Sequence, residues 1–408
     1  MIERMDALAL PLNWQRVRIG DIFFITAGGD LSKPHYSNTK QSDFNYPIYS
    51  NAIEKKGLYG YSSFFIIKNK SITITSRGTI GVAFFRDYPY VPIGRLLVLQ
   101  PKISNIDCRF YAEYINSKVK FNTEQTTIPQ LTIPKVALCE ILLPPLNEQI
   151  SIANILSDVD HYLYTLDALI LKKESVKKAL SFELLSQRKR LKGFNQNWQR
   201  VRLGDIAEIK RGASPRPIEN PKWFCANSNV GWVRISDISK NSRFLYKTAQ
   251  KLSKKGIEKS RFIKQNSLIM SMCATIGKPI ITKIDTCIHD GFVVFENPKI
   301  DLNYLYYFLC YIEKEWLESG QQGSQVNLNV DLIKNKEVFC PKDLNEQIAI
   351  ANILSDLDSE IISLKNKKRQ FENIKKALNH DLMSAKIRVL KNETPQKSRA
   401  NPLFKGNP

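Results

Sequence analysis

No set of side chains in this sequence has the spacing of an active site. The string nearest to a phosphate-binding loop, at 272–279, contains Gly277 and Lys278 but lacks the leading glycine and the hydroxyl residue that the loop requires. The four histidines are far apart, and none stands at metal-ligand spacing from a cysteine. The NPPY or DPPF tetrapeptide of amino-methyltransferases is also missing. We therefore expect a binding protein without catalytic residues, cofactor or metal site of its own.

The remaining histidines and cysteines have ordinary structural explanations. His161 and His380 fall on two long helical patterns, where a solvated histidine is expected. Cys273, Cys287 and Cys310 could lie near one another in space, but we interpret them as thiols of the core.

The polar residues have types that suit DNA, because lysine and arginine bind phosphates while arginine, amides and hydroxyls read base edges. Candidate readers lie in loops that differ between two similar halves of the chain and at a Thr-Ile-Gly turn in each half. In the first half they are Lys33, His35, Tyr36, Asn51, Ser76, Arg77, Thr79, Gln125 and Gln130. In the second half they are Arg216, Arg234, Ser236, Thr275, Lys278, Gln321, Gln322, Gln325 and Asn327. The alternative for each is a solvated polar side chain; Arg77 and the loop 321–327 are the strongest candidates.

Two further features are open to more than one interpretation. Trp14 and Trp198, each two residues before an arginine, are expected in the domain cores rather than as stacking platforms for bases. The basic run 188–190, with Lys192, could contact phosphates or could be the solvated end of a helix.

A segment that occurs twice would position these loops. Residues 146–190 open with LNEQISIANILSDVD and residues 344–388 with LNEQIAIANILSDLD, and KKAL follows in the same register at 177–180 and 375–378. A helix packed on a partner needs this constancy, because one extra residue turns everything beyond it by about 100°. The pattern predicts two long helices that pack on each other as an antiparallel coiled coil. The alternative is that each helix lies on its own domain.

Apolar residues at steps of three and four predict the contact face of these helices. The packing residues are Val159, Leu163, Leu166, Ile170, Leu180, Leu357, Ile361, Leu364, Phe371 and Leu378, and the stripe also includes Val176, Leu184, Ile374 and Leu382. Asn147 and Asn345 are predicted N-caps.

Each half has the same order of motifs: NWQRVR, then TIG, then LNEQI and the helix. Between them, residues 31–60 have no counterpart in 211–255, so the two domains share a fold but differ in what they touch. Strands are predicted at 71–75, 81–85, 92–99, 232–235, 267–271, 279–284 and 292–295, and helices at 109–119 and 303–318. The fold class is α+β, with mixed domains at 1–145 and 193–343, helices at 146–192 and 344–390, and a basic, disordered tail at 391–408.

Composition and charge indicate which class of binding partner to expect. The chain has 408 residues, 43% of them hydrophobic, and a net charge of +21, which favours a polyanionic partner such as nucleic acid over a membrane surface. No run of apolar residues is long enough to span a bilayer, and the N-terminus lacks a signal pattern. Seven scattered cysteines indicate reduced thiols, so we expect a cytoplasmic protein.

The motifs together resemble the specificity subunits of type I restriction–modification systems, often called HsdS. The resemblance rests on WQRVRIGDI and WQRVRLGDI, on SRGTIG and CATIGK, and on the two LNEQI strings, in the same order twice over nearly the whole chain. The second turn has Cys273-Ala274 where the first has Arg77-Gly78, so the base contact expected of Arg77 is not transferred to the second domain.

The resemblance implies a non-catalytic subunit that binds an asymmetric, bipartite site on double-stranded DNA, one domain on each half-site. The helices would set the distance between the two half-sites and would dock two adenine methyltransferase subunits. Restriction and translocase subunits would join the complex for cleavage. S-adenosylmethionine, ATP and Mg²⁺ would then be bound by the partners. The alternatives are the recognition subunit of a type II relative, a coiled-coil scaffold that binds no DNA and, weakly, a nuclease.

Overall fold

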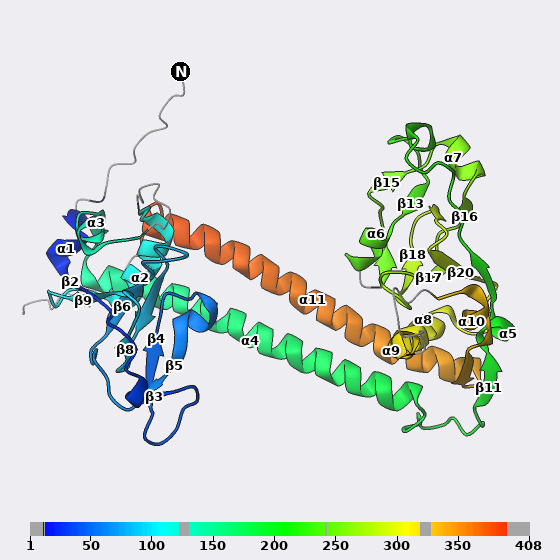
Figure 1. Ribbon diagram of the computed structural model, residues 1–408, viewed down its shortest axis with the longest axis horizontal. Helices are drawn as coiled ribbons and strands as arrows, with labels where there is room; N and C mark the ends of the chain where they lie inside the picture. The colour runs from blue at the N-terminus through cyan, green and yellow to red at the C-terminus, as the bar shows by residue number, and fades with distance from the viewer. Residues whose placement is uncertain (1–10, 12, 122–129, 241–242, 319–327, 390–408) are drawn as a thin grey trace, which may run out of the picture. The chain divides into compact units, whose positions relative to one another are not determined.

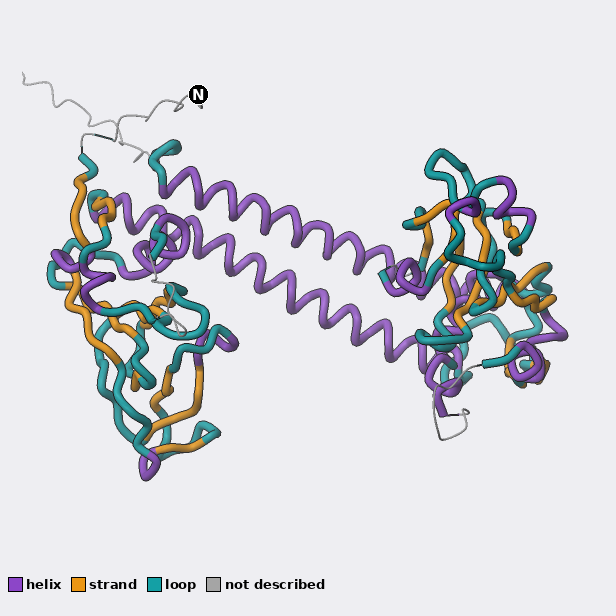
Figure 2. The backbone as a smooth tube through the Cα atoms, turned by 45° about the horizontal axis from the view of Figure 1, so that its top comes forward, coloured by secondary structure: helices purple, strands orange, loops and turns teal. Residues whose placement is uncertain are grey.

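The computed structural model describes residues 11, 13–121, 130–240, 243–318 and 328–389 (Figure 1). The chain forms two compact units: unit 1 comprises Met1–Leu166 with Lys367–Pro408, and unit 2 comprises Asp167–Asn366. Two helices of 40 residues, α4 (Leu146–Leu185) and α11 (Leu344–Met383), each contribute one part to each unit (Figures 1 and 2). This confirms the predicted α+β fold with two long helices.

The long helices differ from the prediction at both ends. They stop before residues 190 and 388, because Gln187 and Ala385 adopt left-handed backbone conformations, with φ of 61° and 55°, that close a helix C-terminus. They also begin at Leu146 and Leu344, so Asn147 and Asn345 are inside the first turn and are not N-caps. Before α11, the Asp343 carboxylate accepts a hydrogen bond from the backbone N–H of Asn345 instead, at 2.8 Å.

Within each unit the parts of α4 and α11 pack side by side in opposite directions. Contacts in unit 1 join Tyr162 to Phe371, with ring centroids 4.5 Å apart, and Asp160 to Lys375. In unit 2 the equivalent of the second contact joins Lys177 to Asp358. All ten predicted packing residues are buried or half-buried.

The prediction is wrong for two other residues of the stripe, because the side chains of Val176 and Ile374 are 39% and 50% exposed. Lys173 and Lys177 take the contact positions in α4, continuing the steps of three and four from Ile170. Their ammonium groups reach carboxylates of α11, so lysine side chains replace apolar ones in this part of the seam.

Unit 1 is built on three small sheets. The central sheet has the antiparallel order β2 (Phe23–Ala27), β9 (Leu97–Pro101), β6 (Ser71–Ile74), β7 (Ala83–Arg86). The second has the order β3 (Tyr36–Ser37), β5 (Leu58–Ser62), β4 (Tyr46–Tyr49), β8 (Val91–Pro92), and the third pairs β1 (Gln15–Arg18) with β10 (Glu140–Leu143). Helices α1 (Ile19–Ile22), α2 (Cys108–Lys118) and α3 (Ile133–Ala137), with the turns η1 (Lys33–His35) and η2 (Glu54–Gly57), complete the unit.

Unit 2 repeats this framework. Its central sheet has the order β12 (Glu208–Arg211), β20 (Phe292–Glu296), β17 (Leu268–Ser271), β18 (Pro279–Thr282), β14 (Phe244–Leu245). The second has the order β15 (Gln250–Lys251), β13 (Gly231–Val233), β19 (Thr286–Ile288), β16 (Arg261–Ile263), and the third pairs β11 (Gln199–Arg202) with β21 (Glu337–Cys340). The shorter helical elements are α5 (Leu203–Ile206), η3 (Pro221–Trp223), α6 (Ile235–Ser239), α7 (Lys254–Glu258), α8 (Leu302–Tyr311), α9 (Glu313–Glu318) and α10 (Val330–Asn335).

The predicted strands are present, with one break. The strand expected at 92–99 is divided into β8 and β9, because Gly94 and Arg95 both have positive φ and turn the chain out of the extended conformation. The helix expected at 303–318 is likewise divided at Ile312 into α8 and α9. In each unit, apolar faces of the central sheet, the helix that follows it and the start of a long helix form one core.

Candidate nucleic-acid interface

A buried carboxylate at the start of each long helix explains the sequence repeats. In unit 2, Glu346 is 1% exposed and accepts hydrogen bonds from the Trp198 indole N–H, at 3.2 Å, and from Arg190, whose Nη2 lies 3.0 Å from Oε2. Trp198 comes from the NWQRVR motif, Glu346 from LNEQ, and Arg190 from the segment after α4. One charge-assisted cluster therefore joins three motifs that are far apart in the sequence.

Unit 1 contains the same cluster built from equivalent residues. Glu148 accepts from the Trp14 indole N–H at 3.0 Å and from Nε of Arg388 at 2.9 Å. The tryptophans therefore belong to the cores, as predicted, and Arg190, from the basic run after α4, is an ion-pair partner of Glu346. Each arginine follows one long helix and binds the first turn of the other, which fixes both helices to the unit.

The glutamine of the LNEQ motif positions the helix that follows the central sheet. Gln149 accepts from the backbone N–H of Asp107, and Gln347 accepts from that of Asp301, at 2.9 and 2.8 Å. These aspartates are the N-caps of α2 and α8. The shared motifs thus hold the framework, and the variable loops are left to contact a ligand.

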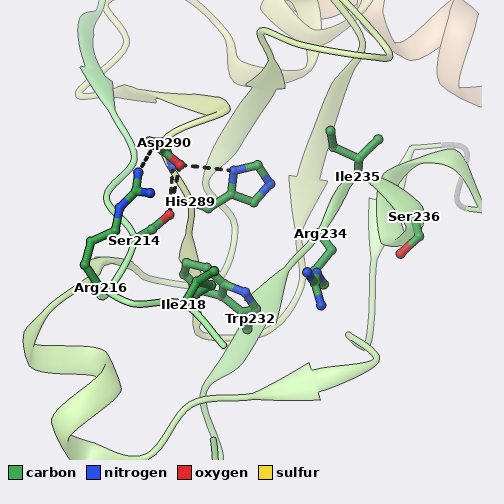
Figure 3. Close-up of a pocket in the computed structure, with 9 residues that line it drawn as sticks. All are labelled: Ser214, Arg216, Ile218, Trp232, Arg234, Ile235, Ser236, His289 and Asp290. Carbon is green, nitrogen blue, oxygen red and sulfur yellow. Dashed lines mark hydrogen bonds and ion pairs between the residues drawn. The ribbon is translucent and has the colours of Figure 1, made fainter. Parts of the chain in front are cut away.

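In unit 2 the structure brings three predicted residues, Arg216, Arg234 and Ser236, to one cavity of about 380 Å³ (Figure 3). Arg216 pairs with Asp290 at 2.9 Å and leaves 74% of its side chain exposed. Arg234 is exposed, and its Nη1 donates to Gln250 Oε1 at 2.8 Å. The cavity therefore presents guanidinium and hydroxyl groups of the types that bind base edges and phosphates.

His289 and Asp290 also line this cavity and were not predicted as site residues. His289 is largely buried, which lowers its pKa, and its Nδ1 accepts from the Gly291 N–H at 2.9 Å. A neutral ring in this arrangement has its Nε2–H available as a donor. Although burial opposes ionisation of Asp290, bonds from Ser214 and Arg216 keep its pKa below the usual value, so it is an acceptor beside these donors.

His289 and Asp290 could have been predicted from their position relative to the strands. Both residues directly follow β19, at the edge where β13 also ends before Arg234. Parallel neighbouring strands deliver the residues after their ends to one place, and β13 and β19 are parallel. That pairing is not visible in a single sequence.

In unit 1, Arg77 and Gln130 lie together at a cavity of about 420 Å³, with Arg95 beside them. Arg77 Nη2 is 3.5 Å from Gln130 Oε1, and both side chains are exposed. Thr79 is also exposed at the same Gly-containing turn. This cavity differs in its residues from that of unit 2.

Other predicted residues of unit 1 lie elsewhere or are used internally. The Asn51 side chain accepts from the Ser76 amide at 2.8 Å and donates to the Gly94 carbonyl at 2.6 Å, and Ser76 is fully buried. These two residues hold the turn that carries Arg77. Lys33, His35 and Tyr36 lie at η1 and β3, where the His35 ring contacts Ser63 and Phe64.

The second Thr-Ile-Gly turn offers less to a ligand. The Thr275 hydroxyl is buried without a hydrogen-bond partner, and Lys278 is half-buried near Glu313. Predicted residues Gln125, Gln321, Gln322, Gln325 and Asn327 lie outside the described residues.

The described part of the chain contains neither a metal-binding cluster nor a membrane-spanning helix. No group of three His, Cys, Asp or Glu side chains there could hold a metal ion. Nor does any described helix combine the length and apolarity needed to cross a membrane.

Comparisons with known proteins agree over both units. The sequence matches the type I restriction modification DNA specificity domain family at residues 11–173 and 195–373. It is 27% identical to the type I restriction enzyme MjaVIII specificity subunit of Methanocaldococcus jannaschii, over 95% of this chain and 96% of that one. A putative type I specificity subunit of Mycoplasma pneumoniae is 32% identical over 37% of this chain and 46% of its own length.

Solved structures share the fold. The S subunit of a type I restriction-modification system from M. genitalium superposes with a TM-score of 0.63 and 18% identity, over 92% of this chain and 97% of that one. The HsdS subunit from Thermoanaerobacter tengcongensis gives a TM-score of 0.51 at 16% identity, over 93% and 98% of the two chains.

Proposed function

The chain belongs to the family of type I restriction-modification DNA specificity proteins, and from this premise we propose that it reads a bipartite DNA site with two different half-sites. The observation that carries the proposal is the contrast between framework and cavities. The two units share the Trp–Glu–Arg cluster, yet Arg77, Arg95 and Gln130 line one cavity while Arg216, Arg234 and Asp290 line the other. Different readers on the same framework give an asymmetric site.

Within this proposal each part of the chain has a separate task. Residues 1–145 and 193–343 are the two target-recognition domains, and 146–192 and 344–390 are the spacers between them. The predicted readers serve as DNA contacts, with the net charge of +21 supplying attraction to phosphates. The α4 and α11 helices act as the ruler between half-sites.

The chemistry in this proposal is carried out by partner subunits. Methyltransferase subunits dock on the long helices, bind S-adenosylmethionine and methylate an adenine in each half-site after flipping it out of the duplex. Restriction and translocase subunits, with ATP and Mg²⁺, join the same complex. The specificity chain contributes DNA recognition and assembly.

Methylome sequencing of a host that carries this gene with its methyltransferase tests the proposal. We expect methylated adenines in a motif of two unlike half-sites separated by unread base pairs. Exchanging residues 193–343 for those of a relative should change one half-site and leave the other intact. A continuous or palindromic motif, or a motif that does not respond to the exchange, would refute it.

A further inference from the structure

An exposed apolar segment at residues 64–66, which we call the tip, follows β5 in the second sheet of unit 1. After β5, the side chains of Phe64, Phe65 and Ile66 are 37%, 38% and 57% exposed in succession. Three consecutive exposed apolar residues on a folded domain call for a partner, because single exposed ones are ordinary but contiguous ones are not.

The backbone of this tip is held firmly. The amides of Ile66 and Ile67 both donate to the Tyr90 carbonyl at 3.0 Å, and the Tyr90 amide donates back to Ile67. Ile67 is 6% exposed and anchors the segment in the core. On the other side, the Phe64 ring meets His35 edge to face at 5.2 Å, and the Phe65 ring meets Tyr46 at 5.0 Å. The apolar side chains are therefore presented in a fixed position before any partner binds.

The surroundings of the tip are cationic. Residues 31–70, which contain the tip, His35 and Tyr46, carry six lysines against two acidic residues, Asp43 and Glu54. Lys68 and Lys70 follow the tip directly and are exposed. Exposed apolar side chains followed by two exposed lysines, in a stretch with a net positive charge, match a stacked base step flanked by phosphates.

We propose that Phe64, Phe65 and Ile66 form a wedge that enters a base-pair step of the DNA bound by unit 1, with Lys68 and Lys70 on the flanking phosphates. Opening a step has an unstacking cost that depends on its sequence and is least at pyrimidine–purine steps. The wedge therefore selects a flexible step without hydrogen-bonding to its bases, and adds specificity that the polar cavity does not supply. This inference rests on the proposed DNA recognition.

The experiment uses the full chain in complex with its methyltransferase and a duplex that carries the methylome motif. Adenines are replaced one at a time by 2-aminopurine and cytosines by pyrrolocytosine, so that every base pair except those of the methylated adenines is probed. We expect a rise in fluorescence at one step that is not a methylation target. The triple variant F64S/F65S/I66S should lose that rise and bind the motif about tenfold more weakly, with non-specific binding unchanged.

Phe24, on β2 of the same unit and 58% exposed, provides the matched control, and F24S should leave both readouts unchanged. If the wild-type complex binds the motif and no probe responds, the wedge is overturned while DNA recognition stands. If the triple variant binds DNA normally but no longer assembles with the methyltransferase, the tip is a protein interface and the proposal is wrong. If the wild-type complex binds no methylome motif, the proposed DNA recognition itself is refuted.

Discussion

Removing the carboxylate of Glu346 should destabilise unit 2 far more than removing an exposed carboxylate of the same unit. In Glu346→Ala the Trp198 indole loses its acceptor, and the Arg190 guanidinium loses its charged partner but still donates to the Gln196 carbonyl, in a site where the glutamate is 1% exposed. Breaking a buried charged pair by deleting one partner costs about 3–5 kcal/mol. Arg190 keeps 26% of its side chain exposed and is partly rehydrated, so we take about 3 kcal/mol.

The matched control is Glu174→Ala, which deletes an ion pair with Lys365 between α4 and α11. Those side chains are 42% and 55% exposed, so the loss should be about 0–1 kcal/mol. Glu346→Gln is the intermediate case, because its amide oxygen still accepts from Trp198 but no longer pairs with a charge.

Thermal unfolding of the full chain, followed by tryptophan fluorescence, gives the measurement. For a unit of about 200 residues, 1 kcal/mol shifts the midpoint by about 2–4 °C, so Glu346→Ala should lower the unit 2 transition by about 6–12 °C. Glu148→Ala should do the same to unit 1. If Glu346→Ala and Glu174→Ala differ by less than about 1 kcal/mol, the cluster does not stabilise the unit and our explanation of the repeats fails.

Three further outcomes follow from the site and the helices. Arg234→Ala should relax one base pair of the half-site read by unit 2, by about 1–3 kcal/mol in competition binding, and leave the other half-site unchanged; Arg200→Ala, at an arginine that is 76% exposed, should affect neither. Burial lowers the pKa of His289 below its usual 6.5, so the unfolded chain takes up that proton first, and the free energy of unfolding should fall as pH drops below 6.5; His289→Asn should flatten this dependence in thermal scans. Inserting four residues at matched positions of α4 and α11 adds about 6 Å and should lengthen the unread gap of the methylome motif by one or two base pairs; an unchanged gap would show that the helices do not set the distance.

The framework could be predicted from the sequence because the chain contains it twice. Constant spacing between LNEQ and KKAL identified both helices, and apolar periodicity placed most of their contact residues. Periodicity failed where lysine takes an apolar position, since Lys177 packs its methylene stem in the seam and pairs with Asp358. A pattern of apolar residues alone cannot detect such a position.

The candidate site was harder to predict, because it depends on which strands are neighbours. Arg216, Arg234 and Ser236 could be selected by residue type, but Asp290 joins them only through the parallel pairing of β13 and β19. Asn51 shows the opposite situation: its side-chain amide suits a base edge, yet its nitrogen donates to the Gly94 carbonyl and its oxygen accepts from the Ser76 N–H. Residue type identifies candidates, and long-range pairing decides between them.

The division of the chain also determines the order in which it can fold during synthesis. Unit 2 is continuous, from Asp167 to Asn366, so all of it is translated before residues 367–389 of unit 1. Unit 1 is completed later than unit 2, because Lys375 and Arg388, which pair with Asp160 and Glu148, follow unit 2 in the sequence. The N-terminal reader is therefore completed last, and a premature stop after Asn366 would leave the second reader whole while depriving the first of its support.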